Sequence, residues 1–306
     1  MSNNFLITRH FYSIILKLCV VLVFLSSCVS ASSNAAAFLE TVIQPRPAGL
    51  GMSYTSIAKG ADAVIWNPAN LGNLTFFESN IGFTRLFETD YIHVQLAYPF
   101  PAFGFGISYI HAGISGIEAS EIGPNHTYTA TGETLSFQGD AVFIGVGKPL
   151  TSYLNAGLTI KLISERTSPF LSYGIGIDSS LLYTFQEFSA GIMFQNILSP
   201  EMRWNTPSSC IDTVPFQLKT GICYSGFKDF NLTVELSSRK NRKEKWHYGI
   251  EYAINPMLNL RSGINNNSLC LGFGLNVKPM QFDFSWEQAP ETFLSSIYRF
   301  SIGYFL

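Results

Sequence analysis

Short segments in which apolar and polar residues alternate follow one another from about Ser79 to the end of the chain. The last segment places Tyr298, Phe300 and Ile302 on one face of a strand and Arg299 on the other. One face of each such segment is apolar and aromatic, while the other carries small, polar and charged residues. A closed sheet with an apolar outside and a polar inside is favourable only when lipid surrounds it. The pattern therefore predicts an all-β fold, a transmembrane antiparallel β-barrel.

The composition agrees with a membrane barrel and excludes helical membrane spans. Charged residues make up 13% of the chain and aromatic residues 14%. After residue 31, no segment contains eighteen consecutive apolar residues, which is what a spanning helix requires. A closed barrel is the other structure that satisfies every backbone group inside lipid. The formal charge of −2 gives no reason to expect a nucleic-acid partner.

Residues 1–31 are predicted to be a secretory signal peptide. Arg9 and Lys17 precede an apolar run at 18–25, and small residues suited to signal cleavage follow it. The four residues that end at Cys28 also resemble a bacterial lipobox, which would leave that cysteine as a lipidated N-terminus. We expect ordinary cleavage, because a lipid anchor is redundant on a protein that already spans a membrane.

About fourteen segments in the predicted barrel domain, 79–306, have the nine to eleven residues that a tilted spanning strand needs. They are 79–87, 90–98, 102–112, 134–148, 153–164, 172–184, 187–197, 214–225, 229–238, 246–254, 257–264, 268–277, 279–287 and 296–305.

The connections between these segments alternate between long and short. If the N-terminus is periplasmic, the even-numbered connections should be tight turns, and all of them are short. The longest connections, 113–133 and 198–213, are odd-numbered and therefore outside, as are the basic stretch 239–245 and residues 288–295. The two longest are expected to form a capture rim.

Residues 32–78 precede the barrel and do not alternate. Gly49 and Gly51 allow close backbone approach, 53–63 is predicted to form a short helix, and Pro68 should end it. A segment rich in small residues can pack inside a barrel as a plug. The alternative is a periplasmic tether, although Trp66 and its neighbours are too apolar to remain in water comfortably.

The run AGLGMSYTSIAKGADAVIWNPANLG resembles the N-terminal signature of the outer-membrane transport superfamily that includes FadL-type channels and the PorV/PorQ family. The matching residues are Ala48, Gly49, Gly51, Ala58, Ala61, Asp62, Ala63, Asn67, Pro68, Ala69 and Leu71. The strands in 153–197 look like the middle strands of PorV-type proteins. The final Tyr304-Phe305-Leu306 resembles the signal that the barrel assembly machinery reads, although an aromatic residue usually stands last.

The resemblance implies a fourteen-stranded barrel with an N-terminal hatch in its lumen. In FadL-type members, hydrophobic molecules bind near the outer rim and leave through a gap in the wall beside the hatch. In PorV-type members, the barrel accompanies secreted proteins in the type IX pathway. The expected hatch and gate residues are Gly49, Gly51, Asp62, Trp66, Asn67, Pro68 and Ala69.

Alternation directs most charged residues of the strands into the lumen, because a charge facing mid-membrane lipid costs about 2–4 kcal/mol. Opposite charges on neighbouring strands predict the cross-strand pairs Lys219–Glu235, Glu251–Arg261 and Asp283–Arg299. Lys161, Asp178 and Glu287 are also expected to face inward.

No residue pattern indicates catalysis. Asp283 and Glu287 lie four residues apart on one strand, ~13 Å, too far for paired-carboxylate chemistry. The histidines do not cluster, and Cys210, Cys223 and Cys270 have no metal-type spacing. No enzyme activity and no cofactor is expected.

The sequence thus predicts an outer-membrane transport barrel that passes hydrophobic small molecules through a lumen gated by an N-terminal hatch. The alternative is a PorV-like barrel that docks secretion components or exported proteins. Expected partners are outer-membrane lipid, a hydrophobic ligand or a secreted protein, and the barrel assembly machinery. Both families share the recognised residues, so the sequence leaves the choice between import and secretion open.

Overall fold

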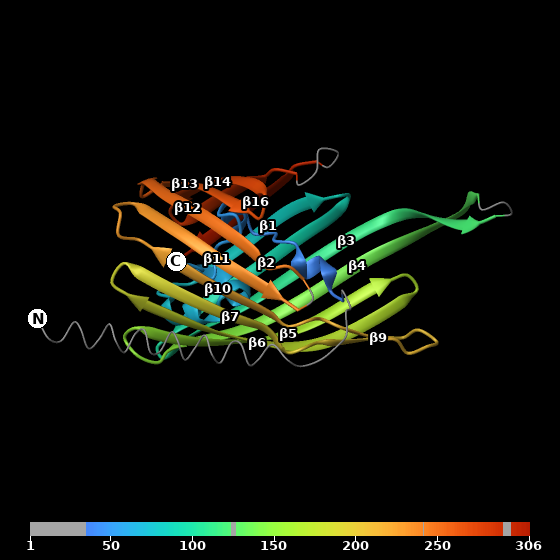
Figure 1. Cartoon of the computed structure of the whole chain (residues 1–306), viewed down its shortest axis with the longest axis horizontal. Helices are drawn as coiled ribbons and strands as arrows, with labels where there is room; N and C mark the ends of the chain where they lie inside the picture. Colours follow the sequence, from blue (N-terminus) through green and yellow to red (C-terminus); the bar gives the residue numbers. More distant parts are fainter. Residues whose placement is uncertain (1–34, 124–126, 241, 290–294) are drawn as a thin grey trace, which may run out of the picture. The chain divides into compact units, whose positions relative to one another are not determined.

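The computed structural model of the chain describes residues 35–123, 127–240, 242–289 and 295–306. The predicted signal peptide, including Cys28, lies outside these residues. The described chain consists of short helical turns followed by sixteen strands (Figure 1).

The barrel is closed by fourteen antiparallel strands, which confirms the predicted fold class. Neighbours run in the order β5-β4-β3-β2-β1-β16-β15-β14-β13-β12-β11-β10-β7-β6, and a β5–β6 pairing closes the ring. The strands are β1 (Glu78–Leu86), β2 (Thr89–Phe100), β3 (Phe103–Ile122), β4 (Tyr128–Pro149), β5 (Leu154–Thr167), β6 (Phe170–Phe185), β7 (Phe188–Leu198), β10 (Gln217–Tyr224), β11 (Phe230–Arg239), β12 (Lys245–Asn255), β13 (Leu258–Asn265), β14 (Ser268–Val277), β15 (Met280–Glu287) and β16 (Ile297–Phe305).

The alternation in sequence becomes an alternation of faces. On β2, Ile92 and Leu96 are 39% and 44% exposed on the outside, whereas His93 and Gln95 are buried on the inside. Aromatic rings gather near one end of several strands, as in the stacked pair Phe100–Phe103 at the β2–β3 turn. An apolar outer band bounded by aromatic residues is the surface that a spanning barrel presents to lipid.

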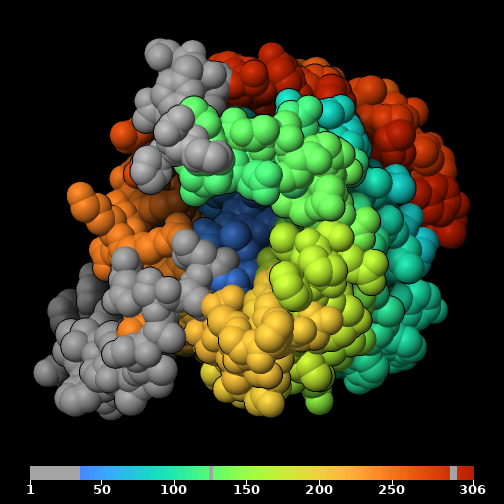
Figure 2. Space-filling view, turned by 90° about the vertical axis from the view of Figure 1, so that its right-hand side faces the viewer, coloured from blue at the N-terminus to red at the C-terminus, as the bar shows by residue number. Residues whose placement is uncertain are grey.

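Residues 35–77, called here the lumen segment, lie inside the ring of strands (Figure 2). Their helical turns are η2 (Ala37–Glu40), α2 (Pro45–Gly49), η3 (Gly60–Asp62), α3 (Ala63–Trp66) and η4 (Pro68–Asn73). No helix among the described residues is long and apolar enough to cross a membrane. The helix expected at 53–63 is wrong: most of that stretch is turns, in which the N–H groups of Tyr54 and Thr55 bond to Glu235 on the wall.

The two longest predicted loops contain strands. Most of 113–133 belongs to β3 and β4, which continue past their neighbours as a two-stranded ribbon. The connection 198–213 carries a small hairpin, β8 (Glu201–Trp204) and β9 (Ile211–Thr213), which pairs with the end of β6. Short polar strands at barrel mouths lack the long apolar alternation by which spanning strands are recognised.

Candidate functional site in the barrel lumen

The inward residues of β12–β16 form a charged wall that holds the lumen segment through α2. Arg46 donates hydrogen bonds from Nε and Nη2 to the two carboxylate oxygens of Glu251, at 3.1 and 2.8 Å. Arg261 bonds the same carboxylate at 2.8 Å and reaches Asp283 with its other nitrogen. All four side chains are at least nine-tenths buried, so these bonds form in a low dielectric, where charge pairing is strong.

Arg299 pairs differently from the sequence expectation. Its nearest carboxylate is Glu287, at 2.7 Å, rather than Asp283, which bonds Arg261. The Nε of Arg299 donates to the carbonyl of Val42 at 2.7 Å. The expected partner was wrong because it was chosen by strand adjacency alone, whereas the long guanidinium also reaches the lumen segment.

Glu235 on β11 binds the backbone of the lumen segment rather than a lysine. One carboxylate oxygen accepts the N–H groups of Tyr54 and Thr55, at 2.9 and 2.8 Å. The expected ion pair with Lys219 is absent from the ion pairs of the described residues, since the Lys219 Nζ instead lies 4.4 Å from the centre of the Trp66 ring. A cation over an indole face is a favourable contact. Lys219 therefore contacts Trp66 of the lumen segment instead of forming an ion pair with Glu235.

The Asn67-Pro68-Ala69 turn is fixed on the opposite side of the ring. The Asn67 Nδ2 donates to the Thr55 carbonyl at 2.8 Å, and its Oδ1 caps η4 by accepting the Ala69 N–H at 3.1 Å. The same N–H also reaches Ser180 Oγ on β6, at 2.9 Å. Gly157 of β5 allows this approach, because a side chain there would overlap the Ala69 backbone.

The two glycines expected in the hatch lie against β13 and β14. Gly51 has a positive φ of 61° and sits against the backbone of Ile264, and its carbonyl accepts a bond from His247 Nδ1 at 3.1 Å. A Cβ on Gly49 would lie 3.2 Å from the Cα of Gly272. Both positions therefore require backbone-to-backbone contact with the wall.

Asp62, at the end of η3, lies beside a cavity of about 260 Å³ that Arg46, Glu78 and Asp283 also line. Its Oδ1 is buried without a hydrogen-bond partner among the described residues. Burial raises the pKa of the Asp62 carboxyl to about 7, and the nearby negative charge of Asp283 acts in the same direction. Glu78 accepts the Ala61 N–H at 3.2 Å and so ties this end to β1.

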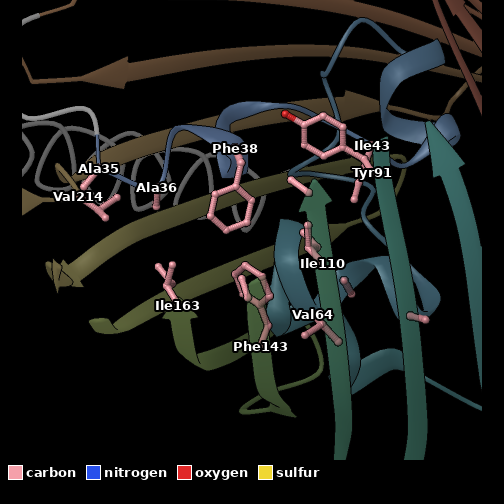
Figure 3. Close-up of a cluster of buried hydrophobic side chains, with 14 of the residues drawn as sticks. Ala35, Ala36, Phe38, Ile43, Val64, Tyr91, Ile110, Phe143, Ile163 and Val214 are labelled. Atoms are coloured by element: carbon pink, nitrogen blue, oxygen red, sulfur yellow. The ribbon is translucent and has the colours of Figure 1, made fainter. Parts of the chain in front are cut away.

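Inward apolar residues of β2–β5 form a cluster, called here the apolar wall, beside inward polar residues such as Gln95 and Lys161. Tyr91, Ile110, Phe143 and Ile163 are at least 93% buried and pack in one cluster with Phe38 of the lumen segment (Figure 3). The same cluster includes Val64 and Leu71 of the lumen segment, and Val214, which precedes β10. A polar lumen is the norm for water-filled barrels, so this apolar stripe is unusual.

A cavity of about 240 Å³ separates the two walls above the lumen segment. Its apolar side includes Ile110, Phe143 and Val214, while its polar side includes Lys219, Glu235 and His247. The cavity therefore presents apolar side chains to the hydrocarbon part of a ligand and polar side chains, on the opposite side, to a polar group of that ligand.

The buried pair Lys161–Asp178 lies beside this cavity, next to an irregularity in the pairing of β6 and β7. The Lys161 Nζ lies 2.6 Å from Asp178, which also accepts the Asn196 N–H at 2.6 Å. The β6–β7 ladder shifts register between Ile177 and Ser179, where β7 carries the extra residues and Asn196 has a positive φ of 59°, so Asp178 faces a bulge in β7.

Sequence reasoning missed several residues that hold the lumen segment, chiefly Arg46, Ser180 and His247. Alternation predicts that Ser180 and His247 face inward, but their partners lie more than a hundred positions away in sequence. Among the described residues, no group of three or more His, Cys, Asp or Glu could hold a metal ion.

No protein-family model matches the sequence, and no curated protein matches it. Two solved structures of the toluene transporter TodX from Pseudomonas putida are similar in fold, both at 11% identity. One has a TM-score of 0.62 and covers 85% of this chain and 97% of TodX. The other has a TM-score of 0.61 and covers 84% and 97%. At this identity the likeness shows the fold, a fourteen-stranded barrel with a short helical N-terminal segment.

Proposed function

We propose that the chain is an outer-membrane channel that admits hydrophobic small molecules from outside, with the lumen segment as its gate. The apolar wall of β2–β5 carries this proposal, because a lumen built only for ions or sugars gains nothing from lining one side with Phe143 and Ile110. The fold of a hydrocarbon channel supports the same function.

The way in which the two walls hold the lumen segment supports the proposed gate. On the charged side, α2 and the turn after it are fixed by directional hydrogen bonds to Glu251 and Glu235. On the apolar side, the side chains of Val64 and Phe38 pack against the wall, and the Val64 carbonyl accepts a hydrogen bond from Thr159 Oγ1 on β5 at 2.9 Å. Packing contacts are non-directional and re-form in many arrangements. The lumen segment therefore moves away from the apolar wall, and a solute passes between that wall and α3.

The test is uptake by vesicles that contain the purified protein, with toluene as the hydrophobic probe and a small sugar as the polar control. The native chain should admit toluene and exclude the sugar. Phe143→Asp, which puts a charge on the apolar wall, should abolish toluene uptake, whereas Ile144→Asn on the outer face of the same strand should retain it. Equal uptake by native protein and Phe143→Asp would refute the proposal.

The gating role has a separate test. Deletion of 48–73 removes the part of the lumen segment that fills the ring, so the barrel should become open and conductive in planar bilayers. Unchanged conductance would show that this segment does not close the pore.

The alternative function that the sequence predicts is a PorV-like role in docking a secreted protein. Assignment to the PorV/PorQ family belongs to the same alternative. A defined protein that co-purifies in stoichiometric amounts would favour it, and lipid or detergent bound in the lumen would favour transport.

A further inference from the structure

Three inward side chains of β2 and β3 are buried without a full set of hydrogen-bond partners. Gln95 and Ser108 are fully buried, and neither the two amide atoms of Gln95 nor the Ser108 hydroxyl has a partner among the described residues. His93, two positions from Gln95, is also buried, and its Nδ1 has no partner in the same part of the chain. Buried polar groups without partners are costly and rare in native proteins, so three of them side by side indicate a role.

These three residues, called here the polar patch, lie directly beside the apolar wall. Ser108 is the cross-strand neighbour of both Gln95 and Phe143, and His93 is that of Ile110. The Cβ atoms of side chains opposite one another on paired strands are about 4.5–5.5 Å apart. A ligand in contact with Phe143 therefore brings a substituent of its ring within reach of Ser108 and Gln95.

The lumen segment covers the polar patch. η3 packs against β1, β2 and β3. A side chain at Gly106, two positions from Ser108, would overlap Val64 of α3. The proposed path runs between α3 and the apolar wall, so a solute that takes this path contacts the patch. The role of the patch therefore rests on the proposed function.

We propose that the polar patch binds a neutral hydroxyl group, so that the channel favours aromatic molecules that carry one, such as phenols, over plain hydrocarbons. The Gln95 amide both donates and accepts hydrogen bonds, and so does the Ser108 hydroxyl. A phenol hydroxyl also donates and accepts, so it satisfies groups of both kinds. Toluene at the same place leaves them unpaired.

The patch offers no cation to a carboxylate. His93 Nε2 lies 2.9 Å from the side-chain oxygen of Asn80, which only accepts, so Nε2 carries the hydrogen and Nδ1 of the neutral ring is an acceptor. Lys161, the cross-strand neighbour of Phe143 on β5, is already paired with Asp178 at 2.6 Å. An anion at the patch would therefore be buried without a counter-ion, which is unfavourable.

Three probes with the same methyl-substituted ring separate these cases. They are toluene, p-cresol and p-toluate, which carry a hydrogen, a hydroxyl and a carboxylate at the same ring position. Titration calorimetry of the full-length barrel in mild detergent measures the three affinities, with protein-free micelles as the blank. p-Cresol should bind about tenfold more tightly than toluene, ~1.4 kcal/mol, as expected for one net hydrogen bond. p-Toluate should bind more weakly than p-cresol.

Substitutions in the patch should remove the preference. Ser108→Ala removes the hydroxyl and Gln95→Leu removes the amide, so the ratio of the p-cresol affinity to the toluene affinity should fall in each. Ser285→Ala is the matched control, because Ser285 Oγ on β15 is likewise fully buried and has no partner among the described residues, but lies in the charged wall. Its ratio should equal the native one.

A native chain that binds p-cresol no more tightly than toluene would overturn the proposal. So would tighter binding of p-toluate than of p-cresol, or a ratio that neither patch variant lowers. Heat-dependent mobility in gels shows that each variant has folded, and Ser108→Ala removes only one oxygen atom. Failure of the native chain to bind toluene at all would instead count against the transport function, so the two failures are distinguishable.

Discussion

The charged and apolar walls of the lumen are built by the same alternation but differ in what faces inward. On β12–β16 the inward residues include Glu251, Arg261 and Arg299, and on β2–β5 they include Ile110 and Phe143. Hydrogen bonds between ions require particular distances and angles, whereas apolar contacts are non-directional. The difference teaches that one wall is suited to holding the lumen segment in place and the other to letting a solute pass.

Removing the centre of the charged wall should have the largest effect. Arg261 is the shared partner of Glu251 and Asp283, and the three side chains are at least 94% buried. Arg261→Met should lower the free energy of unfolding by about 3–5 kcal/mol, because two buried carboxylates lose a partner. Denaturant unfolding in micelles measures the loss. Arg261→Lys, which keeps the charge, should lose less, and equal losses would mean that the pairing geometry is unimportant.

Shortening a side chain of the apolar wall should weaken solute binding and leave the hydrogen bonds that hold the lumen segment intact. Phe143→Ala removes apolar surface from the upper cavity and should weaken toluene binding about tenfold, ~1.4 kcal/mol. Ile144→Ala, one position along and facing lipid, is the matched control and should bind as the native chain does. Titration calorimetry compares them, and equal affinities would remove the apolar wall from the ligand path.

The smallest expected effect is a pH dependence at Asp62. Burial raises the pKa of its carboxyl to about 7, so the docked state favours the protonated form. The contribution of this group to docking should therefore fall as pH rises from about 4 to about 7 and stay low above that. Hydrogen exchange of the amides at 60–66 should quicken over this window, and Asp62→Asn should flatten the change. A native profile that persists in Asp62→Asn would assign it to neighbours such as Glu78 or Asp283.

The barrel could be predicted from the sequence because the alternation within each spanning strand indicates which face meets lipid. All fourteen strands were found in this way, and the inward placement of Glu251 and Arg261 followed from the same phase. Alternation says which face a side chain occupies, and it says so without reference to distant residues.

What the sequence could not show is what lies opposite an inward side chain. Arg299 was paired with the wrong carboxylate, and the bonds from Glu235 to Tyr54 and Thr55 join residues about 180 positions apart. The irregular course of the lumen segment depends on such contacts, which explains why a helix was wrongly expected at 53–63. The apolar wall was also missed, because its inward residues are small or apolar in a pattern shared with soluble strands.

The most direct test of the difference between the walls is to tie the lumen segment to one wall at a time, in a background without native cysteines. Gly49→Cys with Gly272→Cys ties it to β14 in the charged wall, and Val64→Cys with Gly106→Cys ties it to β3 in the apolar wall. In each pair the side chain added at one position meets the other residue. Toluene uptake by vesicles is then measured before and after reduction. Uptake should survive the first disulfide and be blocked by the second until it is reduced, and the opposite pattern, or uptake through both, would contradict the account.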